Sequence, residues 1–182
     1  MNVGTRWMCV LPLLALVAVL GVLVLPATAT SSPTRNTIAL SSLEAGVLQQ
    51  LNAIRVQHHL VPLALSAPLT IASKQHSLEM GQDGYFDHSS HDGTAFWKRI
   101  EHWYSQTGFH FWSVGENLLW SSPGVDSAQA LDMWMHSPEH RANILSARWR
   151  AIGVSAVHFG TAPGTYNGSA VTIITTDFGV RH

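Results

Sequence analysis

The fold is decided by a stretch that opens with Gly115-Glu116-Asn117-Leu118-Leu119-Trp120 and closes with His136-Ser137-Pro138-Glu139-His140-Arg141-Ala142-Asn143-Ile144-Leu145. Polar side chains stand beside apolar ones at both ends, and burying polar groups is costly unless they find partners. Most of the sequence between residue 41 and this stretch has helical periodicity, whereas the sequence after it has the composition of strands. We therefore expect the stretch to lie where helices meet a sheet.

Residues 1–29 have the features of a secretory signal peptide. Arg6 precedes an almost unbroken apolar run over 7–25, and Ala27-Thr28-Ala29 is a small-x-small cleavage site. We expect cleavage after Ala29 and an extracellular location. A membrane anchor formed by residues 7–25 is the alternative, because the run is long enough to span a bilayer. Residues 30–40 are predicted to be a disordered lead-in, and residues 41–182 a single domain.

Composition limits the function of the mature chain. Removing 29 of the 182 residues leaves 153, enough for one domain with its own core. The only cysteine, Cys9, lies in the signal, so packing, alone or with a metal, must hold the domain without disulfides. The ten Lys and Arg of the full chain fall to nine without Arg6 and nearly balance eleven Asp and Glu, and they form no basic stripe, which argues against nucleic-acid binding. We expect a monomer.

The spacing of apolar residues predicts the secondary structure. Helices are expected over 42–58, from residue 66 or 67 to between 81 and 84, from Thr94, and after Asp126 or Ser127. Ser137 as N-cap with Pro138 at the first helical position predicts a fifth, short helix. Strands are expected over 151–158 and 170–180, separated by a turn at Asn167-Gly168.

Four side chains are candidates for a shared site: His88, Glu116, Glu139 and His140. Two imidazoles and two carboxylates can hold a divalent ion, or they can form a hydrogen-bonded cluster on the floor of a cleft. If Ser137 is the N-cap, the positive end of the helix dipole favours a neutral His140, which is the form that binds metals. The alternative for His140 is a surface position in the first helical turn.

One metal motif is excluded by local geometry. The run from His136 to His140 matches the H-x-x-E-H pattern of inverted zinc proteases, which needs a continuous helix. Pro138 should interrupt that helix.

Other residues are expected to support the cleft or the core. We expect hydrogen bonds to the four candidates from His76 on the second helix, from Asn117 and Asn143, and from His91 unless it is exposed. Large aromatics dominate protein cores, so we assign three tryptophans to the core: Trp120, Trp134 and Trp149.

The order and spacing of motifs along the chain match a known family. The matching segments are Leu51-Asn52-x-x-Arg55, Pro62-Leu63, Leu69-x-x-Ala72, His76-Ser77-x-x-Met80, Tyr85-Phe86-Asp87-His88, Gly115-Glu116-Asn117-Leu118, Trp134-x-x-Ser137, His140-Arg141-x-Asn143-Ile144-Leu145 and Ile152-Gly153-Val154. The chain resembles the CAP superfamily of cysteine-rich secretory, antigen 5 and pathogenesis-related proteins, in its bacterial SCP-like extracellular branch. It departs from the pattern in lacking disulfides, in carrying His91 where a proline is usual, and in carrying His59 where a glycine is common.

The resemblance implies an α+β fold, a three-layer α-β-α sandwich with a central, mostly antiparallel sheet. It also implies a cleft lined by two histidines and two acids, which map onto His88, His140, Glu116 and, with altered spacing, Glu139. In some relatives the two histidines bind a divalent ion, often zinc, so Zn²⁺ or another divalent cation held by His88 and His140 is expected as the cofactor if there is one.

Three functional interpretations remain. The first is an extracellular binding module whose cleft takes a small apolar ligand, such as a lipid or sterol, or a peptide. The second is a protease-like, metal-assisted hydrolase in which Glu116 or Glu139 activates a water. The third is a purely structural polar cluster. We favour the first, because no obvious nucleophile accompanies the cluster and catalytic zinc sites usually have three protein ligands.

Overall fold

The computed structural model describes residues 38–182. The predicted signal peptide and most of the predicted lead-in lie outside the described residues. Four strands form one sheet in the order β1-β3-β4-β2. Their bounds are β1 Ala64–Leu65, β2 Trp112–Ser121, β3 Ala151–Phe159 and β4 Val171–Arg181. The β3–β4 and β4–β2 pairs are antiparallel and β1 pairs with β3 in parallel, so the sheet is mixed but mostly antiparallel.

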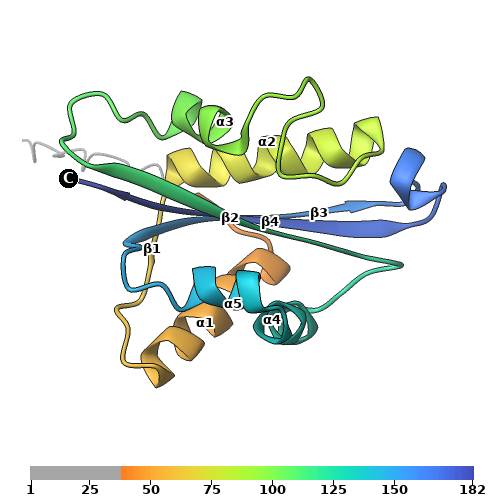
Figure 1. The fold of residues 1–182 in the computed structure, drawn as a ribbon. Helices are drawn as coiled ribbons and strands as arrows, with labels where there is room; N and C mark the ends of the chain where they lie inside the picture. Colours follow the sequence, from red (N-terminus) through yellow and green to blue (C-terminus); the bar gives the residue numbers. More distant parts are fainter. Residues whose placement is uncertain (1–37) are drawn as a thin grey trace, which may run out of the picture. The chain divides into compact units, whose positions relative to one another are not determined.

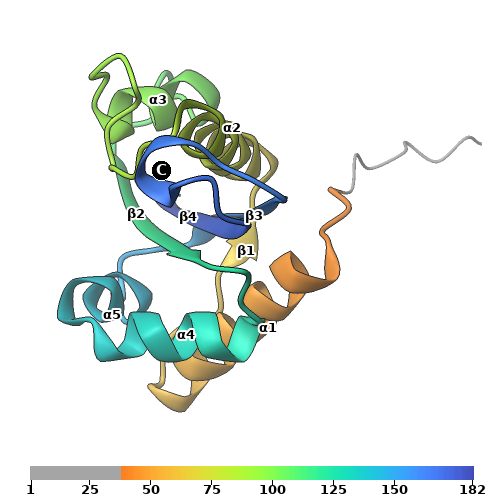
Figure 2. The ribbon, with the colours of Figure 1, turned by 90° about the vertical axis from the view of Figure 1, so that its right-hand side faces the viewer.

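Helices cover both faces of this sheet. Figure 1 shows α2 and α3 on one face and α1, α4 and α5 on the other, and Figure 2 shows the same separation after a quarter turn. The helices are α1 Ser42–Gln57, α2 Ala67–Asp83, α3 Phe96–Trp103, α4 Ser127–His136 and α5 Pro138–Ile144, and a 3-10 turn spans Gly164–Tyr166. The predicted three-layer α+β architecture is confirmed.

Local sequence signals explain most helix boundaries. Ser41 with Glu44, and Asp126 with Gln129, form capping boxes that satisfy free N–H groups at the starts of α1 and α4. The last turn of α2 ends at Gly84, whose φ of 72° is left-handed and suits glycine.

Three details differ from the sequence-based expectation. The helix expected from Thr94 begins at Phe96, because the Asp92 carboxylate accepts a 2.8 Å hydrogen bond from the Thr94 N–H and holds this segment in a turn. Residues 115–120, which include the polar pair Glu116 and Asn117 beside apolar residues, lie inside strand β2, which was not predicted. The two-residue strand β1 was not predicted, since it is defined only by its pairing with β3.

The core is densest around β3 and β4. Residues 171–180 of β4 are all buried, which is expected for a strand covered on both faces. Helix α2 lies very close to β3: a Cβ at Gly153 would fall 2.1 Å from the carbonyl carbon of Leu69. Within residues 38–182, no helix has the length and apolar character needed to cross a membrane.

Candidate functional site

Strand β2 is an edge strand, and its alternating side chains reach opposite layers. Glu116 is hydrogen-bonded to Arg99 of α3, while the next residue, Asn117, bonds to the backbone of α5. Successive residues of a strand point to opposite faces, which explains this division. The Gly-Glu-Asn segment therefore connects the two helical layers.

Glu116 is the centre of a buried ionic cluster. Its Oε1 accepts a 2.8 Å hydrogen bond from Nδ1 of His88, and its Oε2 accepts one from Nη2 of Arg99. Burial alone would raise the pKa of Glu116, but the His88 hydrogen bond and the charge of Arg99 bring it below its usual value. The carboxylate is therefore charged at neutral pH, with both oxygens engaged.

A second carboxyl group lies behind the first. Asp177 of β4 is the cross-strand partner of Glu116, is fully buried, and accepts a 2.9 Å hydrogen bond from the Ser73 hydroxyl. Burial, and then the charge of Glu116, raise the pKa of Asp177 well above its usual value. Sequence reasoning missed both Asp177 and Arg99. A buried acid in the Thr-Thr-Asp-Phe-Gly strand was the available signal for Asp177.

The two candidate histidines differ in environment. The side chain of His88 is 52% exposed, and its hydrogen bond to Glu116 raises its pKa against the opposing effect of burial. His140 is the third residue of α5, and burial followed by the charge of His88 lowers its pKa. The neutral form expected for His140 is thus favoured by burial as well as by its place in the first helical turn.

Two asparagines tie α5 to β2. Nδ2 of Asn117 donates to the His140 carbonyl at 3.0 Å, and Nδ2 of Asn143 donates to the Glu116 carbonyl at 3.1 Å and to Oδ1 of Asn117 at 2.9 Å. The bond from Asn143 to the Glu116 carbonyl satisfies one backbone acceptor on the free edge of β2. Asn117 and Asn143 thus hold the backbone that carries Glu116 and His140, the supporting role expected for them.

The remaining predicted residues lie farther from the cluster. Glu139 is exposed in the first turn of α5 and has no recorded bond to the other three candidates. His76 is completely buried on α2, with Nε2 2.9 Å from the Asp87 carbonyl, so it fixes the loop before His88. His91 is exposed, with its ring 5.4 Å from that of Tyr85. The structure therefore brings together His88 and Glu116, places His140 nearby, and leaves Glu139 at the surface.

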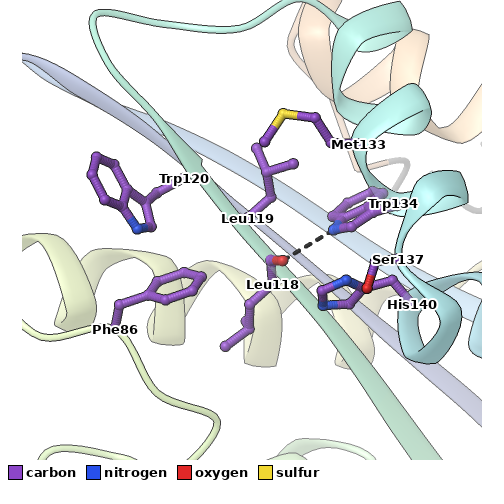
Figure 3. A pocket seen from close by; sticks show the side chains of 8 residues that line it. All are labelled: Phe86, Leu118, Leu119, Trp120, Met133, Trp134, Ser137 and His140. Carbon is purple, nitrogen blue, oxygen red and sulfur yellow. Dashed lines mark hydrogen bonds between the residues drawn. The ribbon is translucent and has the colours of Figure 1, made fainter.

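An apolar pocket of about 250 Å³ adjoins this cluster along β2. Figure 3 shows the side chains that line it, which come from β2, from the segment after α2, and from α4 and α5: Phe86, Leu118, Leu119, Trp120, Met133, Trp134, Ser137 and His140. Trp134 also donates its indole N–H to the Leu118 carbonyl at 3.0 Å, which fixes the wall between strand and helix. Trp134 and Trp149 are buried as predicted, but Trp120 is only half-buried because it faces this pocket.

His88 and Glu116 line a separate cavity of about 350 Å³, together with Asn143, Arg148 and Trp149. Its walls mix charged and apolar groups, whereas the pocket along β2 is apolar except at the end formed by Ser137 and His140. The two candidate histidines therefore line different cavities, His140 the apolar pocket and His88 the mixed one.

Few side chains near His88 and His140 are available as ligands for a metal ion. Among residues 38–182, no three His, Cys, Asp or Glu side chains lie together in an arrangement that could hold an ion. Nδ1 of His88 already binds Glu116, so the histidines offer one ring nitrogen of His88 and those of His140. This set does not fit the three or four protein ligands typical of zinc sites.

Known proteins are similar to this chain in sequence and in fold. The sequence model of the family "CAP: Cysteine-rich secretory protein family" matches residues 48–172. An uncharacterized protein of Bacillus subtilis, YkwD, is 30% identical over 138 residues; the match covers 75% of this chain and 51% of YkwD, so the chain spans about half of that relative.

Solved structures repeat the architecture. An outer surface protein of Borrelia burgdorferi superposes with a TM-score of 0.63 at 17% identity, over 80% of this chain and 97% of that one. An extracellular Bacillus anthracis protein containing an SCP domain superposes with a TM-score of 0.55 at 26% identity, over 78% of this chain and 44% of that one. Because the family model matches more than half of the chain and the fold agrees with it, the chain belongs to the CAP, or cysteine-rich secretory protein, family.

Proposed function

We propose that this CAP-domain chain is an extracellular binding module whose pocket along β2 takes a small apolar ligand or an apolar side chain of a peptide. The observation that carries the proposal is the lining of that pocket: six of its eight side chains are apolar, and Ser137 and His140 provide polar groups at one end. Binding sites for small molecules typically combine apolar walls with a few placed polar groups.

The pocket is framed by elements that are individually fixed. The indole of Trp134 is hydrogen-bonded to β2, and α5 is tied to the same strand by Asn117 and Asn143. Met133 is 48% exposed at the side of the pocket, and methionine adapts its shape to varied apolar partners. A ligand would therefore enter a largely preformed site with one adaptable wall.

The alternative hydrolase finds less support in the geometry. Both oxygens of Glu116 are engaged, so this carboxylate is poorly placed to accept a proton from a water. Glu139 is exposed and outside both cavities.

Export is part of the proposal. The predicted signal peptide supports it, as does the likeness to the Bacillus anthracis protein described as extracellular. The amino-terminal sequence of the chain recovered from culture medium tests it, and Thr30 is the expected first residue.

Binding is tested with the neutral apolar fluorophore phenylnaphthylamine, whose emission rises in apolar surroundings. We expect saturable binding to the wild type and a loss of about tenfold or more in Met133→Glu, because the new carboxylate must be desolvated beside the ligand. Val56→Glu is the matched control, since Val56 is 55% exposed on α1 and lies outside the pocket. Absence of binding in the wild type, or equal binding in Met133→Glu, would contradict the proposal.

A further inference from the structure

Four segments of the chain meet at one end of the sheet. Strands β1, β2 and β3 begin at this end and β4 finishes there, because β1 is parallel to β3 and the other two pairings are antiparallel. The segments that flank these strand ends are 58–63, 104–111, 145–150 and 179–182, and Figure 1 shows them on the side of the molecule marked by the C label. We call their combined surface the sheet-end face.

The sheet-end face is positively charged. Its four segments contain no Asp or Glu, although the chain has eleven, and they carry three arginines: Arg148, Arg150 and Arg181. The first two are exposed and the third is partly exposed, and within residues 38–182 none of the three forms an ion pair. The α-carboxylate of His182 opposes one of these charges. The face therefore keeps an excess of positive charge, whereas the whole chain has a formal net charge of -1.

Two phenylalanines protrude from the same face. Phe109 is 41% exposed and Phe111 is 46% exposed. The N–H of Phe111 donates to the His182 carbonyl at 2.9 Å, and the His182 N–H donates to the Phe111 carbonyl at 3.1 Å. The Phe111 ring also stacks on the His182 ring, with 5.1 Å between the centroids. The backbone that carries these exposed rings is therefore held in place, and Val61 of segment 58–63 adds a third apolar side chain that is 61% exposed.

Arg181 links the charge to the exposed rings. Its guanidinium lies 4.0 Å from the ring centroid of Tyr104 and 4.6 Å from that of Phe109, and its Nη1 donates to the Ser105 carbonyl at 2.8 Å. A cation is thus fixed beside an exposed apolar ring. Proteins that lie on a bilayer surface combine such apolar side chains, which enter the acyl boundary, with Lys or Arg, which attract anionic headgroups.

The combination of charge and exposed apolar rings distinguishes between possible occupants of the face. A soluble polyanion would neutralise the arginines but would leave the phenylalanines in water. A neutral bilayer would cover the phenylalanines but would supply no counter-charge. A second copy of the chain, joined through the same face, would bring three more arginines against these three, and like charges across an interface are unfavourable. An anionic bilayer satisfies both features.

We propose that the sheet-end face docks on the surface of an anionic lipid bilayer. Phe109 and Phe111 enter the boundary between headgroups and acyl chains, and the three arginines contact lipid phosphates. The apolar pocket along β2 is lined by other residues, so this contact goes beyond the proposed function and places the binding module at a membrane.

The test uses the chain without residues 1–29, so that the apolar run over 7–25 adds no membrane binding. Residues 37–182 form a compact unit, and every described helix and strand is kept. Sedimentation with sucrose-loaded vesicles compares phosphatidylglycerol mixed with phosphatidylcholine against phosphatidylcholine alone. We expect binding to the anionic vesicles only. The double variants Phe109→Ser with Phe111→Ser and Arg148→Gln with Arg150→Gln should each lose about tenfold or more in affinity, and urea unfolding checks that both remain folded.

Two control variants change exposed side chains outside the sheet-end face. Met133→Glu on α4 and Arg141→Gln on α5 should bind vesicles as the unsubstituted chain does. Because Met133→Glu should still lose the apolar fluorophore, the two proposals can fail separately. Binding to neither kind of vesicle, equal binding to both, or unchanged binding in the phenylalanine pair would overturn the proposal. A dimer in sedimentation equilibrium that the phenylalanine pair dissociates would assign the face to a second copy instead.

Discussion

The carboxyl group of Asp177 lies across the β2–β4 ladder from Glu116, and both are buried with the single guanidinium of Arg99 to balance them. Two buried carboxylates with one close cation are costly unless a proton is retained. The pKa of Glu116 lies below its usual value and that of Asp177 well above, so Asp177 holds the proton. Glu116 and Asp177 thus form a buried pair of one carboxylate and one neutral acid.

Asp177→Asn is expected to flatten the pH dependence of stability. Because the native pKa of Asp177 is raised, the folded chain keeps a proton that the unfolded chain releases near pH 4. Wild-type stability therefore falls as pH rises above roughly 4 towards the native pKa, with a limiting slope of about 1.4 kcal/mol per pH unit from this group. Asparagine preserves the shape and cannot titrate, so the variant should gain on the wild type as pH rises.

Urea unfolding of both proteins between pH 4 and 8 measures this difference. Asp83→Asn, at the exposed end of α2, is the matched control and should run parallel to the wild type. A constant difference between Asp177→Asn and the wild type across the range would show that Asp177 is charged in the folded state.

The two cleft histidines are expected to titrate on opposite sides of the usual value, roughly 6.5. The Glu116 hydrogen bond raises the pKa of His88, whereas burial and the charge of His88 lower that of His140. Protonated His88 therefore stabilises the fold below pH 6.5 or so, and this contribution is lost as pH rises through its raised pKa. Imidazole proton resonances followed by NMR give both values.

Glu116→Gln should bring the pKa of His88 down, because an amide offers a weaker acceptor without charge. Glu101→Gln, at a partly exposed position of α3, should leave His88 unchanged. If His88 titrated below 6.5 or so in the wild type, the hydrogen bond to Glu116 could not be present in solution.

Zinc binding is expected to be weak and to depend on His88 and His140. The two imidazoles lack a third ligand in the observed arrangement of residues 38–182, and only their neutral forms bind, so affinity should fall as pH drops. Calorimetric titration near pH 7.5 compares the wild type with His88→Ala plus His140→Ala, which should abolish binding and still unfold cooperatively. The pair His58→Ala and His59→Ala, exposed after α1, should bind as the wild type does; unchanged binding in the first pair would refute the site.

Capping and turn residues made much of the secondary structure predictable from the sequence. Contacts between segments far apart in the chain could not be predicted in this way. Ser137 and Pro138 mark the start of α5 correctly, and Asn167 and Gly168 adopt the positive φ of a turn between β3 and β4. The Tyr-Phe-Asp-His and Gly-Glu-Asn segments also placed His88 and Glu116 together.

The other residues of the ionic cluster around Glu116 are brought together by strand pairing, which a short stretch of sequence does not reveal. Asp177 meets Glu116 only because β2 and β4 pair with a particular alignment. Arg99 follows Lys98 on a short helix, and two adjacent charges are typical of a solvated face, yet Arg99 is 5% exposed. The family resemblance implies Glu139 as the second acid of the cleft. Consecutive helical residues point in different directions, so His140 faces the pocket and Glu139 faces solvent.

Arg55 is expected to contribute more to stability than any surface arginine, because it holds three backbone carbonyls. The side chain is fully buried; its Nε donates to Val61 at 3.0 Å, and its Nη1 donates to Ile144 at 2.7 Å and to Ser146 at 2.9 Å. It thereby joins the end of α1 to the end of α5, the helix that carries His140.

Lysine has one compact ammonium and cannot reach all three acceptors, so Arg55→Lys should cost about 3 kcal/mol in the free energy of unfolding. Arg141→Lys, on the exposed side of α5, should change it by less than about 0.5 kcal/mol. Urea unfolding at neutral pH measures both, and equal small losses would mean that water, rather than Arg55, satisfies these carbonyls.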